Sequence, residues 1–207
     1  LYSQGIHYCA YRFESGNRAL LKEQSFNVES SLEWNSEWVR LEVALYQNTI
    51  ANYVYIRPSG QAVDGWQVYT WEATDAQFNG GEASLQVRPA DWKHLHADAV
   101  FSLVDARDHD GEGLPLIPPA TLRSTVEWAN GIAGRLNGLF ANVVWNYNRD
   151  ASLLHLAAGG ELSDVLAVNL SVQNLLNTEF IPTMSMLREL NIAEPGRNVR
   201  VQLVWKF

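Results

Sequence analysis

The residues best suited to cation chemistry lie in one short stretch between two periodic segments. Asp108, His109, Asp110 and Glu112 lie there together with two glycines, and a glycine after two carboxylates resembles half of a calcium loop. The complete ligand spacing and the final bidentate glutamate are missing. The sequence therefore favours a solvated polar loop over a metal site.

Two histidines one residue apart form a second candidate. His94 and His96 project to the same face of an expected strand, because side chains alternate along a strand, and they could bind one metal ion together. A wet sheet face needs polar residues there in any case, and this second interpretation is favoured.

Three aromatic residues form a possible ligand platform. Trp66, Tyr69 and Trp71 lie beside an expected outer loop, and their flat rings suit stacking on sugars or catecholates. The same residues could belong to an aromatic girdle at a membrane interface. Both interpretations remain open.

No arrangement of residues supports catalysis. The sequence contains no Ser/His/Asp pattern, no pair of carboxylates in a catalytic context and no phosphate-binding loop. The one cysteine, Cys9, has no second thiol with which to bond or to hold zinc. A net charge of -8 without a basic cluster argues against nucleic acid as a partner. We therefore expect no enzyme activity and no cofactor.

The last stretch of the chain shows the pattern that must position these residues. From Gly196 to Phe207 the sequence alternates Val199, Val201, Leu203 and Trp205 on one face with polar side chains on the other. Preceding segments repeat this pattern, which fits a transmembrane β-barrel and also a half-buried soluble sheet. No run approaches the roughly 18 apolar residues of a membrane helix, so any spanning would be by strands.

The periodicity predicts nine or ten antiparallel strands joined mostly as sequential hairpins. The expected strands are 26–34, 39–56 with an interruption near 48–52 and an end at Pro58 and Gly60, 66–87, 95–103, 122–128, 139–147, 153–162, 166–172 and 196–207. About two turns of helix are expected within 184–190. Shorter links at 35–36, 89–93, 130–137 and 163–164 alternate with longer ones at 11–24, 57–69, 106–119 and 177–197. Such alternation is typical of an outer-membrane barrel.

Four motifs, in order along nearly the whole chain, resemble those of TonB-dependent outer-membrane receptors. They are Phe13–Asn17 followed by Leu20–Glu23, Gly81–Leu85, Leu116–Arg123, and the C-terminal set of Asn174–Phe180, Glu194–Arg200 and the terminal Phe207. The last set resembles the "N-L-hydrophobic-N", "P-G-R-N" and final Phe of that family. The link Arg149–Ala151 is shorter than the corresponding loop usually is in the family.

The resemblance implies an all-β fold, an antiparallel up-and-down transmembrane β-barrel in the outer membrane of a Gram-negative bacterium. Residues 1–207 would be about the last ten strands of a 22-stranded barrel, without the plug domain and the first half of the barrel. The start at Leu1-Tyr2-Ser3 agrees with a mature chain or a fragment.

The family further implies import of a scarce nutrient such as a ferric siderophore. The expected partners are membrane lipid, the TonB complex through the missing N-terminal region, a small ligand such as an iron chelate, and the barrel-assembly machinery. Trp205 and Phe207 would form the assembly signal, with Phe207 at the periplasmic end. Trp66, Tyr69, Trp71 and His109 are the candidate ligand contacts in outer loops.

Two alternatives belong to other classes: a soluble β-sandwich that binds carbohydrate through exposed tryptophans, and a small self-closing barrel that acts as an adhesin or pore. One observation separates the sandwich from the transporter. The apolar residues Leu41, Val43, Leu139, Val143, Val201 and Leu203 must either form one exposed band or pack between two sheets.

Overall fold

The computed structural model describes residues 6–9, 12–92, 94–133 and 136–205, and they form a single mostly antiparallel sheet. Its eleven strands are β1 (Ile6–Cys9), β2 (Arg12–Ser15), β3 (Gln24–Asn35), β4 (Val39–Val63), β5 (Trp66–Val87), β6 (Leu95–Asp108), β7 (Thr121–Ala133), β8 (Leu136–Asn148), β9 (Ser152–Ser163), β10 (Leu166–Gln173) and β11 (Asn198–Trp205). One short 3₁₀ helix, η1 (Met186–Leu190), lies between β10 and β11. No helix among the described residues is long and apolar enough to cross a membrane.

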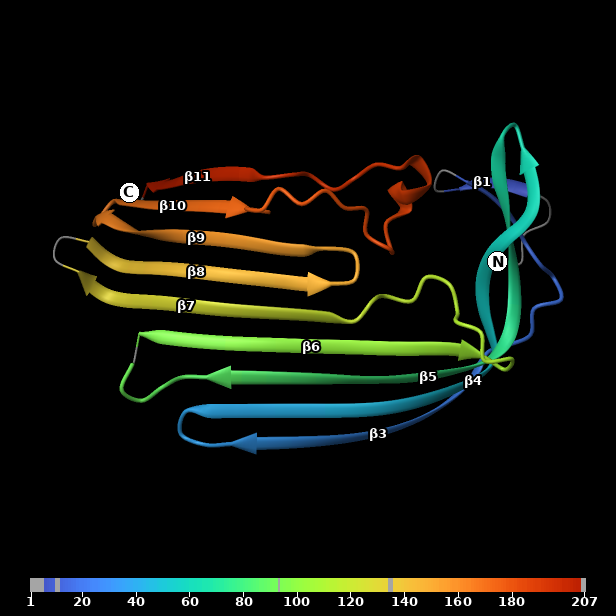
Figure 1. Cartoon of the computed structure of the whole chain (residues 1–207), viewed down its shortest axis with the longest axis horizontal. Coiled ribbons are helices and arrows are strands. Elements are labelled where there is room, and N and C mark those ends of the chain that lie inside the picture. Colours follow the sequence, from blue (N-terminus) through green and yellow to red (C-terminus); the bar gives the residue numbers. More distant parts are fainter. Residues whose placement is uncertain (1–5, 10–11, 93, 134–135, 206–207) are drawn as a thin grey trace.

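Strands β3 to β11 pair in sequence order, each antiparallel to the next, and form one wall (Figure 1). Among the described residues β3 pairs only with β4, and β11 pairs only with β10, so this wall has two open edges. The expectation of a small barrel that closes on itself is therefore not met by these strands. The β1–β2 hairpin adds to the side of β5 in parallel, with Phe13 opposite Val68.

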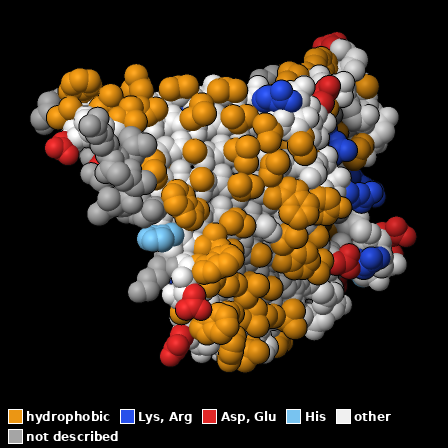
Figure 2. All heavy atoms as spheres, turned by 60° about the vertical axis from the view of Figure 1, so that its left-hand side comes forward, with side chains coloured by type: hydrophobic (Ala, Val, Ile, Leu, Met, Phe, Trp, Pro, Cys, Tyr) orange, Lys and Arg blue, Asp and Glu red, His pale blue; other side chains and the backbone are white. Residues whose placement is uncertain are grey.

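One face of the wall is apolar from edge to edge. Strand register aligns the odd-numbered residues of β4, β5 and β6 in rows such as Val43, Ala83 and Phe101, and similar rows continue to Leu170 and Val201. The six apolar residues that distinguish a sandwich from a transporter all lie on this face: Leu41, Val43, Leu139, Val143, Val201 and Leu203. Val201 and Leu203 are 63% and 67% exposed. Figure 2 shows apolar side chains gathered over a broad surface. The two-sheet soluble sandwich is therefore wrong.

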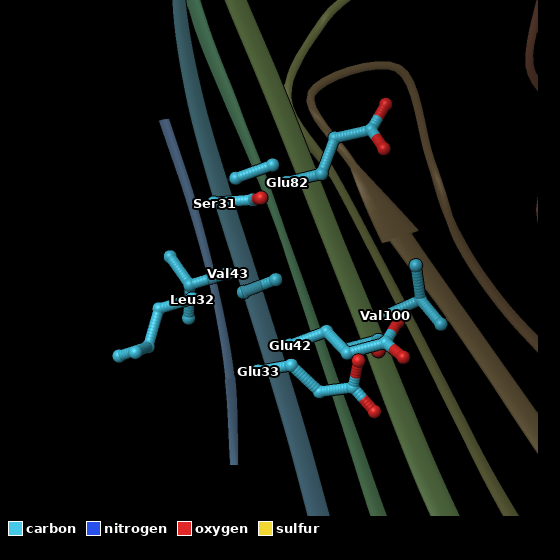
Figure 3. Close-up of a pocket in the computed structure, with 10 residues that line it drawn as sticks. Ser31, Leu32, Glu33, Glu42, Val43, Glu82 and Val100 are labelled. Carbon is cyan, nitrogen blue, oxygen red and sulfur yellow. The ribbon is translucent and has the colours of Figure 1, made fainter. Parts of the chain in front are cut away.

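The opposite face is polar. Glu33 and Glu42 share it with Glu82, and these three side chains extend to one side of the wall while Leu32 extends to the other (Figure 3). An apolar outside and a polar inside are what a transmembrane barrel wall requires, because lipid contacts one surface and the wet lumen the other. The strand alternation predicted from the sequence is confirmed.

Strand β4 is longer than the sequence predicts. It continues through Pro58 and Gly60 to a two-residue turn at Asp64 and Gly65, so 57–69 is the end of a long hairpin and not a loop. Proline and glycine are tolerated because the pairing shifts register between Pro58 and Ala62. The interruption expected near 48–52 is confirmed as a second register shift, with Asn52 at a φ of 57°.

Other element boundaries also differ. Three segments expected as links contain strand: Arg12–Ser15 is β2, 106–108 end β6, and 130–133 end β7. Backbone pairing with a neighbouring strand overrides weak local periodicity at these strand ends. The helix expected within 184–190 is present as the shorter η1.

A small apolar cluster holds the end of β6 and the segment after it against the middle of β5. Ala76, Ala106 and Leu114 are buried, and the Leu114 amide donates to the Ala106 carbonyl at 2.9 Å. Tyr53, Phe78 and Ile117 pack against them. The segment after β6 therefore folds back on the sheet instead of extending freely into solvent.

Candidate functional site at the long-loop end

The connections differ in length between the two ends of the wall. At the end where β11 finishes, β3 and β4 are joined through 36–38, β5 and β6 through 88–94, and β9 and β10 through 164–165. At the other end lie the β4–β5 hairpin tip, the β6–β7 loop 109–120 and the β10–β11 loop 174–197. Among the described residues, two connections at this end are short: the β8–β9 link, 149–151, and the turn at Asp64 and Gly65 that closes the long β4–β5 hairpin. The two longest connections that the structure describes therefore lie at the same end of the wall.

A cavity of about 820 Å³ opens at this end. β6 and β7 stop pairing beyond Ser102 and Thr121, and the β6–β7 loop leaves a gap beside the ends of β6 and β8. The gap is lined by Val104, Ile117, Pro118, Pro119, Ala120, Tyr147, Arg149, Asp150, Thr183 and Arg188. Four parts of the chain far apart in sequence thus meet around one space.

One carboxylate connects two of these parts. The backbone N–H and the hydroxyl of Thr183 each donate to Asp150, both at 2.6 Å. Burial alone raises the pKa of Asp150, but these hydrogen bonds and the nearby Arg188 and Arg149 lower it, and the net pKa lies below its ordinary value. Asp150 therefore stays ionised and ties the β10–β11 loop to the β8–β9 link.

The two arginines beside Asp150 are exposed at the cavity. Guanidinium groups bind carboxylate and phosphate oxygens in a planar, often bidentate geometry, so this cavity is suited to an anionic ligand. Sequence reasoning missed Arg149, Asp150, Thr183 and Arg188 as a site. Its only signal was the unusually short link at Arg149–Ala151.

The predicted aromatic platform is not a single surface. Trp66 and Tyr69 are separated by an odd number of positions in β5, which runs without a register shift, so they lie on opposite faces. Trp66 lies at the hairpin tip, opposite Val63, and is 38% exposed. Tyr69 and Trp71 share the other face.

Tyr69 and Trp71 hold the β1–β2 hairpin. The Trp71 Nε1 donates to Glu14 at 3.2 Å, and Glu14 pairs with Arg12 at 2.9 Å. The Arg12 guanidinium lies over the Tyr69 ring, 4.9 Å from its centre. In this structure the two rings contact protein groups, and ligand stacking by them stays a prediction.

The predicted polar loop organises itself through its own backbone. Asp108 Oδ1 accepts hydrogen bonds from the amides of Asp110 and Glu112, at 3.0 and 2.9 Å. His109 contacts Thr74 through Nδ1 at 3.2 Å and Asp110 through Nε2 at 3.3 Å. Within the described ranges no three metal-ligating side chains gather. A ligand contact by His109 stays a prediction.

The histidine pair lies at the opposite end of the wall. His94 Nδ1 is 3.0 Å from the Ala129 carbonyl, so this ring is engaged with the neighbouring strand. His96 lies opposite Glu127 in the register of β6 and β7. This position separates both histidines from the cavity at the long-loop end.

The C-terminal motif residues build the base of the β10–β11 loop. Asn174, only 4% exposed, donates to the carbonyls of Thr178 and Pro195 and accepts from the Thr178 amide. The Asn177 side chain accepts from the Arg197 amide at 2.8 Å and lies where a side chain on Gly196 would clash. The motif thus carries a structural function that spacing alone does not reveal.

The proposed assembly signal is partly described. Trp205 pairs with Leu166, lies on the apolar face and is 64% exposed. Phe207 lies outside the described residues.

Comparison with known proteins agrees with this geometry. Residues 1–175 match the family described as "TonB dependent receptor-like, beta-barrel". Among solved structures, the copper transporter OprC superposes with a TM-score of 0.74 at 14% identity, over 93% of this chain and 33% of that one. The siderophore receptor PirA from Pseudomonas aeruginosa gives 0.62 at 23% identity, over 95% and 32%. The FrpB iron transporter from Neisseria meningitidis (F3-3 variant) gives 0.65 at 18% identity, over 94% and 32%.

The chain spans about a third of the length of these structures, and at such identities the likeness concerns the fold alone. The match to the family covers most of the chain. The receptors of this family are non-enzymatic transporters with barrels in the outer membrane of Gram-negative bacteria. The chain belongs to the TonB-dependent receptor family and forms part of such an outer-membrane β-barrel.

Proposed function

We propose that the chain is part of a receptor that takes up a scarce nutrient through the outer membrane, energised by the TonB complex. The ligand is an anionic metal chelate such as a ferric siderophore. The observation that carries the proposal is the cavity at the long-loop end, where Arg149 and Arg188 are exposed between three loops. Siderophore and iron transporters among the similar structures agree with this ligand class.

The partners follow from the same assignment. Residues 1–207 form the C-terminal part of the barrel, and the plug and the TonB-contacting region belong to a part of the receptor outside this sequence. The polar face, with Glu33, Glu42 and Glu82, contacts the plug. Trp205 and Phe207 act as the signal for the barrel-assembly machinery. The loops around the cavity, together with Trp66, Tyr69, Trp71 and His109, make contact with the ligand.

The test uses uptake of radiolabelled iron chelates by cells that carry the receptor gene or a deletion of it. Exchange of both Arg149 and Arg188 for alanine should weaken binding of the transported chelate about tenfold, or about 1.4 kcal/mol, since charge-assisted hydrogen bonds are lost. Arg88→Ala, at the opposite end of the wall, is the matched control.

Three results would contradict the proposal. The deletion might leave uptake of every iron chelate unchanged, uptake might persist without the TonB complex, or Arg88→Ala might weaken binding as much as the double variant. A deletion that removed copper uptake and spared iron uptake would also reject the chelate as ligand.

A further inference from the structure

The base of the β10–β11 loop rests on the first residues of β9. Asn174, directly after β10, turns the chain with a left-handed φ of 49°. The amide of the next residue, Leu175, donates to the Leu154 carbonyl at 2.7 Å. The Thr178 hydroxyl donates to the Ser152 carbonyl at 3.2 Å. Backbone carbonyls do not titrate, so these two contacts are the same at any physiological pH.

A third contact at the loop base depends on a side chain that titrates. The backbone N–H of Asn174 donates to Nδ1 of His155 at 3.3 Å. His155 lies on the polar face of β9, because the adjacent Leu156 pairs with Val143 on the apolar face. Histidine is the side chain whose ordinary pKa lies closest to neutral pH, so this contact can change with pH.

The two neighbours of the His155 ring require its neutral form. A backbone N–H can only donate, so Nδ1 must carry the lone pair that accepts the Asn174 amide proton. In the neutral ring the proton then lies on Nε2, where the side-chain amide of Asn146 is 3.1 Å away and can turn its oxygen toward that proton. Both ring nitrogens are thus satisfied. A second proton, on Nδ1, would point at the Asn174 N–H, and two facing donors would replace the hydrogen bond.

The groups around the ring do not favour a positive charge. Arg123 on β7 is the charged side chain that acts on the ring, and its charge has the same sign as that of a protonated imidazole. The residues beside His155 on β8, β9, β10 and in the loop are uncharged: Val144, Asn146, Leu153, Ala157, Gln173 and Asn174. Protonation therefore adds repulsion from Arg123 to the loss of the hydrogen bond with Asn174, and both effects favour an open loop base.

We propose that neutral His155 positions the β10–β11 loop, and that uptake of one proton by this ring releases the loop base. The loop carries Thr183 and Arg188, which line the cavity at the long-loop end. Acidification therefore loosens the side of the cavity that these two residues form. The effect on a bound chelate rests on the proposed function, whereas the effect on the loop does not.

The test is hydrogen exchange over residues 174–178 in the purified full receptor, without ligand, at pH 7.5 and pH 5.5. The open base binds a proton at the ordinary histidine pKa of about 6.5 and the closed base does not, so opening should become about tenfold more frequent. Protection factors, which correct for the direct effect of pH on exchange, should fall by that factor. Asp150 stays ionised over this range, so its bonds to Thr183 do not contribute.

Three variants assign the pH dependence. His155→Asn keeps an acceptor near the position of Nδ1 and cannot take up a proton, so its protection should resemble that of the wild type at pH 7.5 and stay unchanged at pH 5.5. His155→Leu removes the acceptor and should show low protection at both pH values. His96→Asn, at the opposite end of the polar face, is the matched control and should keep the tenfold change.

Wild-type protection that is equal at the two pH values would overturn the inference. A tenfold change that persists in His155→Asn, or that disappears in His96→Asn, would overturn it as well. Heat-modifiable mobility on gels confirms that each variant is folded, and His155→Asn alone decides the outcome if His155→Leu fails to fold. The readout contains no ligand, so this inference and the proposed function can fail separately.

Discussion

At the residue scale, one buried asparagine holds the base of the longest loop that the structure describes. Asn174 satisfies two carbonyls and one amide while its backbone has a left-handed φ of 49°. Alanine removes all three hydrogen bonds and tolerates that conformation poorly. We expect Asn174→Ala to destabilise the loop by about 2–4 kcal/mol. Faster hydrogen exchange throughout 175–197 checks this, and exchange equal to that of the wild type would contradict it.

A second prediction concerns the tie between Asp150 and Thr183. The folded pKa of Asp150 lies below its unfolded value, so its stabilisation is present above the unfolded pKa and is lost as pH falls through the folded pKa. The loop should therefore loosen below about pH 4. Asp150→Asn should loosen it at neutral pH, because an amide offers one acceptor oxygen in place of two.

The measurement is limited proteolysis within the β10–β11 loop as a function of pH. We expect Asp150→Asn to be cleaved about fivefold faster than the wild type at pH 7, which corresponds to about 1 kcal/mol of loop stability. This is below the usual value for a hydrogen bond to a charged group, because Asp150 is partly solvated. The difference between the variant and the wild type should vanish at low pH. A difference that persisted there would assign the effect to something other than the carboxylate.

Candidate site residues were only partly predictable from the sequence. Aromatic type and loop proximity identified Trp66, Tyr69 and Trp71, but the face on which each lies depends on its position in β5. The contacts of Tyr69 and Trp71 depend on β2, which is remote in sequence and pairs with β5. The cavity around Arg149 and Thr183 brings together loops remote in sequence, so no local spacing could reveal it. The motif asparagines were found through resemblance, while their hydrogen bonds required the structure.

At the element scale, the alternation of apolar and polar residues predicts which segments form strands, but it does not predict where those strands end. The apolar and polar faces of β4 to β11 were predictable because lipid and water impose a period of two. Pro58 and Gly60 indicate an end to β4 by local rules, but the register shift beside them allows the hairpin to continue. Beyond the membrane both faces meet protein or water, so the periodicity that defines a strand fades there.

The two faces of β11 give a paired prediction. Val201 lies in the middle of the strand on the apolar face, and the adjacent Gln202 lies on the polar face beside Asn169. Val201→Arg should destabilise the barrel by about 2–4 kcal/mol, because it places a charge in lipid. Gln202→Arg, the matched control, should cost little. The folded fraction in lipid vesicles, from heat-modifiable mobility, checks the pair, and equal losses would contradict the assignment of faces.

At the scale of the whole molecule, loop length predicts orientation. The end of β11 should be periplasmic, so the long loops face the outside. Protease added to intact cells should cut the β6–β7 loop near 106–119, most of which lies beyond β6, and spare the turn at Asn35 and Ser36. Cleavage confined to Asn35 and Ser36 would reverse the topology. Permeabilised cells, in which both ends are accessible, provide the control.

The last prediction follows from the two open edges. Strands β3 and β11 each present a row of backbone N–H and C=O groups without a neighbour among the described strands. In lipid each such unsatisfied group costs several kcal/mol, so an open wall cannot persist and must pair with further strands. If β3 instead paired with β11, the resulting barrel would be much narrower than a 22-stranded one, and its lumen could not hold a plug.

We therefore expect residues 1–207, expressed alone in a strain that lacks its own receptor, to give no TonB-dependent uptake of any iron complex. The complete receptor gene in the same strain is the control and should restore uptake. Surface labelling of the 109–120 loop distinguishes a chain that failed to insert from one that inserted and closed without a plug, and both states are inactive for the reasons above. Uptake restored by the isolated chain would show that these strands complete a working transporter without partners, and would overturn the argument from edges and diameter.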